Sequence, residues 1–251
     1  MPESHVTTKT EMGIATISFF TPEHNALPTA ILIKLETAIS AAGTDDEVKV
    51  IVLKSDGNRT FCAGANFNEL IAIENKADGK SFFMGFAKVI LAMRNCGKII
   101  IARVQGKTVG GGVGLAAAAD YCFATQHASI KLSEISIGIG PFVIAPAVER
   151  KIGNSAFAEL TLNAHRFFEP QWAHDKGLYH EVFEEVEAMD KAIAELTEKL
   201  TSYNTEALKG SKTIFWENTE NWSKLLEKRA EMSGNLVLSE FTKNALERFR
   251  K

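Results

Sequence analysis

Apolar residues follow two different patterns along the chain. Up to about residue 132, short runs of consecutive apolar residues, many of them β-branched, alternate with stretches in which apolar residues recur at helical spacing. Runs of four to eight such residues are typical of buried strands. We predict four strands of this kind: Ile14–Phe19, Val48–Leu53, Ile99–Val104 and Ser129–Leu132. Strands that alternate with helices predict an α/β fold.

The stretch between the first two strands has the pattern of an amphipathic helix. Pro28 suits the first turn of a helix that runs to Ala42, since proline is favoured in that turn. One face of this predicted helix carries apolar residues at helical spacing: Ile31, Leu35, Ala38, Ile39 and Ala42.

The pattern changes after about Pro146. Segments such as Ala188–Leu200 and Asn221–Leu238 are charged and periodic, and strand signals nearly disappear. These features predict helices. We therefore expect an α/β core over residues 1–190, followed by a C-terminal helical region over residues 191–251.

Composition limits the kinds of function. A chain of 251 residues with a formal net charge of −3 has no basic excess of the sort that binds nucleic acid. It has no apolar run of the roughly 20 residues that span a membrane, and its polar start lacks a signal-peptide core. Three scattered cysteines, Cys62, Cys96 and Cys122, suit a reducing compartment. We expect a cytoplasmic protein that binds neither nucleic acid nor membrane.

A run of three glycines precedes an alanine tract in Thr108–Tyr121, TVGGGVGLAAAADY. Glycines before a helix can mark a phosphate site, but neither phosphate motif fits here. A dinucleotide fingerprint that starts at Gly110 needs glycine where Leu115 stands. A P-loop that ends at Thr108 needs glycine where Ile101 stands. These backbone positions are therefore expected to approach something other than a phosphate.

A second segment of small residues, Thr60–Leu70 (TFCAGANFNEL), also follows a predicted strand. Its Ala63-Gly64-Ala65 lets the backbone come close to a ligand. Two backbone N–H groups that point at one oxygen form an oxyanion hole. The two segments are therefore either two tight strand-to-helix turns or the two halves of such a site.

Four segments, taken in their order and spacing, resemble the crotonase (enoyl-CoA hydratase/isomerase) superfamily over about residues 10–250. They are Glu23–Leu27 (EHNAL), Phe61–Ala65 (FCAGA), Gly106–Asp120 and Ser133–Pro141 (SEISIGIGP). The resemblance implies a spiral of ββα units, C-terminal helices that form a homotrimer or a dimer of trimers, and an acyl-CoA thioester as substrate. It implies no cofactor apart from the coenzyme A of the substrate.

The resemblance also assigns roles by position. The backbone N–H groups of Ala65 and Gly111 would bind the thioester oxygen, and Glu134 would be the acid/base. Substrate-binding positions would be Ala26, Ala63, Asn66, Phe67, Gly114, Pro141 and Phe142. The neighbouring residues alone leave two interpretations of Glu134. It is either an acid/base with a pKa that is raised by burial, or a strand-end carboxylate paired with a cation such as Lys131.

Two departures from the family pattern bear on the reaction. Many hydratases of the family carry a second glutamate where this chain has Gly114, and Phe142–Ala145 (FVIA) is bulkier than usual and should narrow the acyl pocket. A single glutamate suits a double-bond isomerase, although one carboxyl could also activate a water for hydration. The Ser133–Ile144 stretch also resembles bacterial methylglutaconyl-CoA hydratases, which keeps hydration open. A catalytically weak acyl-CoA-binding protein is the other alternative.

Several further residues are expected to be structural. The histidines have no metal-ligand spacing, so we expect no metal site. Cys62 is expected to be a small buried residue, and the aromatic side chains of Phe82, Phe83 and Phe86 are expected in the core or in a pocket wall. The basic C-terminal end, formed by Lys243, Arg248, Arg250 and Lys251, is either a solvated helix face or a contact to a CoA phosphate.

Overall fold

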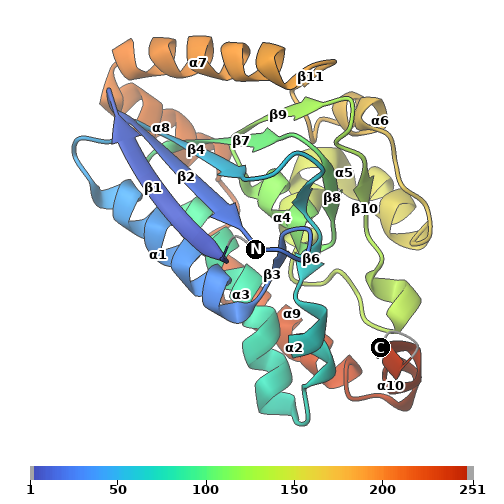
Figure 1. The fold of residues 1–251 in the computed structure, drawn as a ribbon. Helices are drawn as coiled ribbons and strands as arrows, with labels where there is room; N and C mark the ends of the chain where they lie inside the picture. Colours follow the sequence, from blue (N-terminus) through green and yellow to red (C-terminus); the bar gives the residue numbers. More distant parts are fainter. Residues whose placement is uncertain (1–2, 248–251) are drawn as a thin grey trace.

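A six-stranded sheet forms the centre of the protein in this computed structural model, which describes residues 3–247 (Figure 1). Its strands are β1 (His5–Glu11), β2 (Ile14–Phe20), β4 (Val50–Ser55), β7 (Ile99–Val104), β9 (Tyr121–Thr125) and β11 (Glu181–Phe183), in the order β1-β2-β4-β7-β9-β11. β1 and β2 form an antiparallel pair, and the other neighbouring strands run parallel. The parallel part agrees with the predicted alternation of strands and helices.

Helices cover both faces of this sheet (Figure 1). They are α1 (Thr29–Thr44) and α3 (Lys76–Asn95) on one side, and α7 (Val186–Ser202) and α8 (Thr205–Phe215) on the other. Because alternate residues of a strand point to opposite faces, Ile51 and Leu53 join the core that contains α1 and α3, whereas Val50 and Val52 pack with α7. Burial on both faces explains why β4 is an almost continuous apolar run.

Short strands form a second layer beside the large sheet. β5 (Thr60–Cys62), β8 (Lys107–Val109) and β10 (Ile130–Lys131) make a parallel sheet in the order β10-β8-β5, and β3 (Ala26–Leu27) pairs with β6 (Gly64–Ala65). Each strand of the three-stranded sheet follows a strand of the large sheet along the chain and leads towards a helix. These helices are α2 (Phe67–Ile71), α4 (Gly111–Ala118) and the 3-10 helix η1 (Glu134–Ile137). This repeat of two strands and a helix confirms the predicted ββα fold.

Most predicted elements lie close to the observed ones. β7 has the predicted bounds, and α1 begins one residue later than predicted, with Pro28 at its N-cap rather than in its first turn. The sequence prediction missed seven strands: β1, β3, β5, β6, β8, β9 and β11. β1 is an edge strand whose side chains are mostly exposed, so it needs few apolar residues, and β11 lies in the part expected to be helical. The expected division after residue 190 falls inside α7 and stays a prediction.

The C-terminal helices return to the first half of the chain. α5 (Ala145–Leu162), α6 (Pro170–Asp175), α9 (Trp222–Leu236) and α10 (Glu240–Glu247) are the remaining helices of the described chain. α9 crosses α3 so closely that a Cβ atom on Gly79 would lie 2.8 Å from the Cα atom of Gly234. Beside this crossing, the Lys80 ammonium lies 2.7 Å from carboxylate oxygens of Glu227 and Glu231. The crossing brings side chains of α9 next to those of α3.

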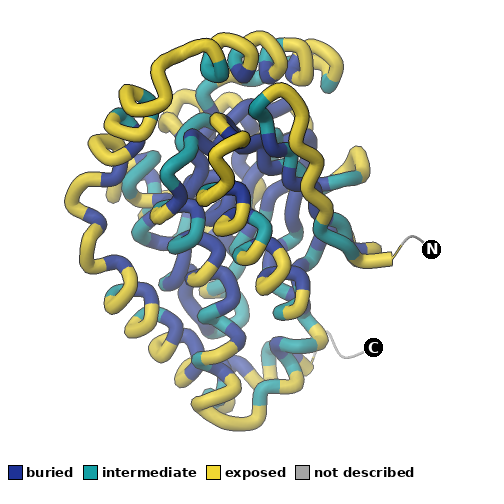
Figure 2. Tube along the Cα trace, turned by 90° about the vertical axis from the view of Figure 1, so that its left-hand side faces the viewer, coloured by how far each residue is buried: buried dark blue, intermediate teal, exposed yellow. Residues whose placement is uncertain are grey.

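Exposure follows the layers of the fold. Figure 2 shows exposed outer turns on the helices and buried chain in the interior. The three cysteines are free and buried.

Within residues 3–247, no helix is long and apolar enough to cross a membrane, and no group of three His, Cys, Asp or Glu side chains is arranged to hold a metal ion. Of the basic C-terminal end, Lys243 is exposed on α10, and Arg248, Arg250 and Lys251 lie outside the described residues.

The loop before β3 is fixed by Asn25, a buried residue with a left-handed backbone (φ 58°). Its side-chain oxygen accepts the N–H of Thr21 at 2.9 Å. Its amide donates to the carbonyl oxygens of Asp56 at 3.0 Å and Thr60 at 2.9 Å. These three bonds hold the β3 loop against the start of β5, and they therefore help to place β6, which pairs with β3.

We expect Asn25→Ala to lower the free energy of unfolding by about 2–4 kcal/mol, because it leaves buried backbone groups unpaired and puts alanine in a left-handed conformation. Asn218→Ala is a matched control, since Asn218 is also left-handed (φ 63°) but exposed. Denaturant unfolding of both variants measures the difference. Equal losses would show that backbone conformation, rather than the buried hydrogen bonds, sets the cost.

Candidate active site

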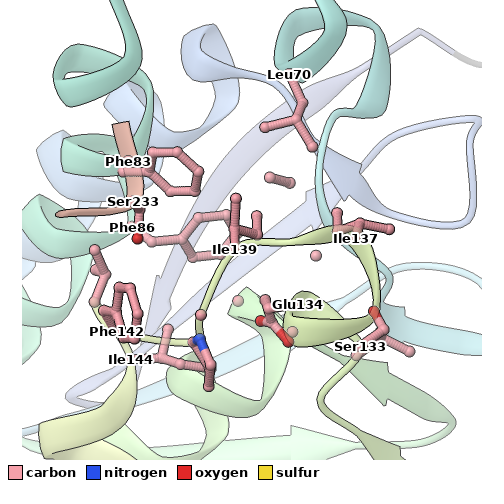
Figure 3. A pocket seen from close by; sticks show the side chains of 18 of the residues that line it. Leu70, Phe83, Phe86, Ser133, Glu134, Ile137, Ile139, Phe142, Ile144 and Ser233 are labelled. Atoms are coloured by element: carbon pink, nitrogen blue, oxygen red, sulfur yellow. The ribbon is translucent and has the colours of Figure 1, made fainter. Parts of the chain in front are cut away.

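A cavity of about 120 Å³ lies where the short strands meet α3, α9 and the segment after η1 (Figure 3). Its walls are mostly apolar. The lining residues are Ala63, Gly64, Ala65, Phe67, Leu70, Phe82, Phe83, Phe86, Val109, Gly110, Gly111, Ser133, Glu134, Ile137, Ile139, Gly140, Pro141, Phe142, Val143, Ile144 and Ser233. Both small-residue segments that the sequence singles out therefore face the same space.

The two segments approach each other at their glycines. A Cβ atom on Gly64 would lie 3.3 Å from the carbonyl oxygen of Val109 and 3.7 Å from the nitrogen of Gly111. Gly64 also has a positive φ of 93°, a conformation that favours glycine. Bare backbone at this position thus allows the chain around Ala65 to lie beside the start of α4.

The N–H of Gly111 is suited to bind an anion or a polarised oxygen. Gly111 is the first residue of α4, so its N–H has no acceptor within the helix. The helix dipole adds partial positive charge at this end. Ala65 and Gly111 both line the cavity. The arrangement brings together the two residues that the sequence assigned to an oxyanion hole.

Glu134 lies next to these backbone groups. It is the first residue of η1, and its Oε1 would be 3.0 Å from a Cβ atom on Gly110. Its Oε2 is buried and has no hydrogen-bond partner among the described residues. The alternative that Glu134 pairs with Lys131 is wrong, because this Oε2 has no partner within residues 3–247 and the Lys131 ammonium lies over the ring of Phe167, 5.2 Å from its centre.

Burial raises the pKa of the Glu134 carboxyl to about 7, because an apolar environment disfavours its charged form. Backbone N–H groups of Glu134 and Ser133 oppose this effect and hold the pKa lower than burial alone would. Near neutral pH, both the protonated and the ionised carboxyl are therefore populated. A group of this kind can take up and return a proton at working pH.

The raised pKa predicts a pH-dependent stability. Between the ordinary value of 4.5 and about 7, the folded chain holds a proton on Glu134 that the unfolded chain releases. The free energy of unfolding of the wild type should therefore fall with pH across this range, by about 3 kcal/mol in all from this group. Glu134→Gln should not show this part of the fall. The stability of the variant relative to the wild type should rise from pH 4.5 to 8, as measured by urea unfolding, and a constant difference would contradict the raised pKa.

The predicted substrate-binding residues fall into two groups. Ala63, Phe67, Pro141 and Phe142 line the cavity, whereas Ala26, Asn66 and Gly114 do not. Ala26 lies in β3 and pairs with Gly64 of β6. Asn66 caps α2, its side-chain oxygen accepting the N–H of Glu69 at 3.1 Å.

Gly114 is buried against α5. A Cβ atom there would overlap the side chain of Ile144 and lie 3.5 Å from Cδ1 of Ile90. The position where many hydratases of the resembled family carry glutamate is therefore packed by an isoleucine. This differs from the expectation that Gly114 would border the acyl group, and the reason is the bulk of Ile144.

The cavity has an aromatic side that the sequence only partly predicts. Phe82, Phe83 and Phe86 of α3 all line it, which confirms the expectation of a pocket wall. The ring of Phe142 lies over Gly140, where a Cβ atom would overlap it. Sequence reasoning missed Ser233, which reaches the cavity from α9 through the close crossing with α3. Only the small residues at the crossing, Gly79 and Gly234, could have indicated it.

Cys62 and His24 are two reactive-looking residues that do not line the cavity. Cys62 is fully buried, and burial raises the pKa of its thiol to about 12, so the thiolate is scarce at neutral pH. Its sulfur accepts the N–H of Gly64 at 3.4 Å. This confirms the expectation of a small buried residue. His24 is exposed in the loop before β3.

Comparisons with known proteins identify the family and the fold of this chain. A model of the enoyl-CoA hydratase/isomerase family matches residues 9–250. A peroxisomal Delta(3,5)-Delta(2,4)-dienoyl-CoA isomerase of Arabidopsis thaliana is 28% identical over 215 residues, or 79% of this chain and 76% of that protein. A probable enoyl-CoA hydratase of Bacillus subtilis is 26% identical over 244 residues, or 94% and 92% of the two chains. The crystal structure of enoyl-CoA hydratase from Bacillus halodurans has the same fold, with a TM-score of 0.91 at 20% identity over 97% of this chain and 99% of the other.

Proposed function

Because the chain belongs to the enoyl-CoA hydratase/isomerase family, the crotonase superfamily, we propose that it moves a proton next to the carbonyl of an acyl-CoA thioester, with Glu134 as the acid/base. Removal of that proton places negative charge on the thioester oxygen. The N–H groups of Ala65 and Gly111 would stabilise this enolate. The observation that carries the proposal is the Glu134 carboxyl, whose buried Oε2 has no hydrogen-bond partner among the described residues and which lies beside the start of α4 in one apolar cavity.

Isomerisation of a double bond is the reaction that the site supports best. Ionised Glu134 would take a proton from the carbon next to the carbonyl of a 3-enoyl thioester, and the electrons of that C–H bond would form a dienolate. The protonated carboxyl would then return the proton two carbons further along, which gives the 2-enoyl thioester and regenerates the carboxylate. Among the described residues that line the cavity, Glu134 is the only carboxylate, and one acid/base is sufficient for this exchange.

Hydration is the second candidate, since relatives of this chain include a probable enoyl-CoA hydratase. In that reaction, Glu134 would deprotonate a water that attacks the carbon β to the carbonyl. The same carboxyl would then give its proton to the α-carbon. A hydratase and an isomerase therefore share the oxyanion donors and differ in the fate of the proton and of the water.

Heavy-water experiments separate these reactions. The protein is incubated in heavy water with 2-enoyl-CoA and 3-enoyl-CoA esters of about four to six carbons, because the cavity is slightly smaller than the roughly 150 Å³ that holds benzene. Isomerisation interconverts the esters and introduces deuterium only where the proton held by the carboxyl exchanges with solvent before its return, whereas hydration adds the mass of one heavy water. Mass spectrometry and chromatography distinguish the products. If the esters bind but every one is recovered unchanged, the chain is instead a catalytically weak acyl-CoA-binding protein.

Gly114→Glu examines whether a second carboxyl can be added. We expect it to lower the free energy of unfolding by about 1–3 kcal/mol through overpacking against Ile144, and to lower turnover. Adding Ile144→Ala makes room, and in that double variant hydration of short straight-chain esters should increase. Gly210→Glu is the control, because a Cβ atom on Gly210 meets nothing within 4 Å. Unchanged stability and turnover in Gly114→Glu would contradict tight packing at this position.

The proposal includes the assembly and setting that the sequence predicts. We propose a homotrimer or a dimer of trimers, in the cytoplasm, that needs no cofactor beyond the coenzyme A of its substrate. Family membership and a fold shared with enoyl-CoA hydratase support this part. Light scattering after size-exclusion chromatography measures the assembly, and activity after exhaustive dialysis against a chelator tests the absence of a metal.

A further inference from the structure

Ser233 carries a buried side-chain hydroxyl in the wall of the cavity. It is 1% exposed, and its Oγ has no hydrogen-bond partner among the described residues. Its side chain lines the cavity, and Figure 3 shows it beside Phe83, Phe86 and Phe142, away from Glu134. The cavity thus has one polar end at Glu134 and a separate hydroxyl on its aromatic side.

Neither helix geometry nor packing explains this hydroxyl. A serine within a helix usually bonds a carbonyl of the preceding turn or points to water, and Ser233 does neither within the described chain. The close crossing of α9 and α3 at Gly234 requires small residues, but alanine is also small. An alanine at position 233 would avoid the free-energy cost of a buried, unpaired hydroxyl. A ligand that bonds Oγ would offset that cost.

The cavity also restricts the charge of such a ligand. Its described lining residues include no lysine, arginine or histidine, and its polar side chains are Ser133, Glu134 and Ser233. A carboxylate at the Ser233 side would be buried without a cation, which is strongly unfavourable. A hydroxyl or ketone oxygen carries no charge and can bond a serine hydroxyl.

We propose that Ser233 binds an uncharged oxygen, a hydroxyl or a ketone, that the acyl chain carries at the end remote from its thioester. This inference rests on the proposed function, because the thioester must lie at Ala65, Gly111 and Glu134. The acyl chain then extends along Phe86 and Phe142 and ends at Ser233. The substrate class is therefore a short acyl-CoA with a hydroxyl or keto group, and a second carboxylate is disfavoured.

Binding of saturated acyl-CoA esters tests this without depending on turnover. Each oxygenated ester is paired with an alkyl ester of equal chain size: 4-hydroxybutanoyl-CoA with pentanoyl-CoA, 5-hydroxypentanoyl-CoA with hexanoyl-CoA, and 4-oxopentanoyl-CoA with 4-methylpentanoyl-CoA. Calorimetry gives a Kd for each ester with the wild type and with Ser233→Ala. For at least one pair, the ratio of the Kd of the oxygenated ester to that of the alkyl ester should rise about tenfold in the variant.

Two further variants make the measurement decisive. Ser233→Cys keeps the shape of the side chain but bonds weakly, so it should raise the same ratio even if alanine disturbs the helix crossing. Ser223→Ala removes an exposed hydroxyl from the same helix and should leave the ratio unchanged. A ratio that changes less than twofold for all three pairs in both Ser233 variants overturns the inference.

The outcome is distinguishable from failure of the proposed function. If the esters bind with a preference that depends on Ser233 but no enoyl-CoA is turned over, the oxygen site stands and the catalytic proposal fails. If enoyl-CoA esters are turned over but the Kd ratio does not change in the Ser233 variants, the catalytic proposal stands and the oxygen site fails. If no CoA ester binds at all, both proposals are contradicted.

Discussion

Glu134→Gln is expected to lower kcat by about 10²–10⁴-fold, the usual contribution of a general acid or base. Glutamine keeps the size of the side chain but cannot accept the substrate proton. The position next to the start of α4 and the absence of another carboxylate in the described lining leave no other group to replace it. Steady-state kinetics with the ester identified in the heavy-water experiment gives kcat, and calorimetry with a saturated ester checks that binding remains.

Glu149→Gln is the matched control for this change. Glu149 is exposed on α5 and lies outside the cavity, so its replacement should leave kcat unchanged. The pH profile supplies an independent readout. If ionised Glu134 removes the proton, kcat/KM of the wild type should fall about tenfold for each pH unit below about 7, where burial places the pKa of this carboxyl. Wild-type turnover in Glu134→Gln would exclude it from the mechanism.

The sequence predicts those parts of the fold in which local pattern and burial coincide. Ile99–Val104 is buried on both faces of the sheet, so its apolar run gives the strand with its correct bounds. β1 cannot be predicted in this way. It pairs along one edge only and its side chains are mostly exposed, so a polar sequence such as HVTTKTE can form it. Two-residue strands such as β6 depend on pairing with β3 and have no pattern of their own.

In the candidate site, too, some features can be predicted from local sequence and others depend on contacts between distant residues. Glycines at positions 64, 110 and 111 mark a close approach of backbone segments, because side chains there would be strained or would overlap neighbours. The contact of Ile144 with Gly114 joins residues that lie 30 positions apart, and composition alone gives no sign that one fills the space beside the other. Ser233 is still more remote, since its place in the cavity depends on how α9 crosses α3.

Gly111→Val should reduce kcat by at least about 10²–10³-fold, the cost of losing one oxyanion donor. A Cβ atom at this position would overlap the ring of Phe86. Either the ring must move into the acyl cavity, or the first turn of α4 must shift and carry its N–H away from the thioester oxygen. Both movements damage the site. Gly210→Val is the control, because a Cβ atom on this glycine of α8 meets nothing within 4 Å.

Combining Gly111→Val with Phe86→Ala separates the two causes of this loss. Removing the ring makes room for the valine, so α4 can keep its native position and its N–H can still bind the oxygen. We therefore expect a higher kcat in the double variant than in Gly111→Val alone. Its KM should be higher than that of the wild type, because Phe86 also lines the acyl cavity. No recovery would indicate that the β-branched side chain alters the helix start directly. Normal kinetics in Gly111→Val alone would place the oxyanion site elsewhere, because the valine must displace either the ring that lines the acyl cavity or the helix turn that carries the donor.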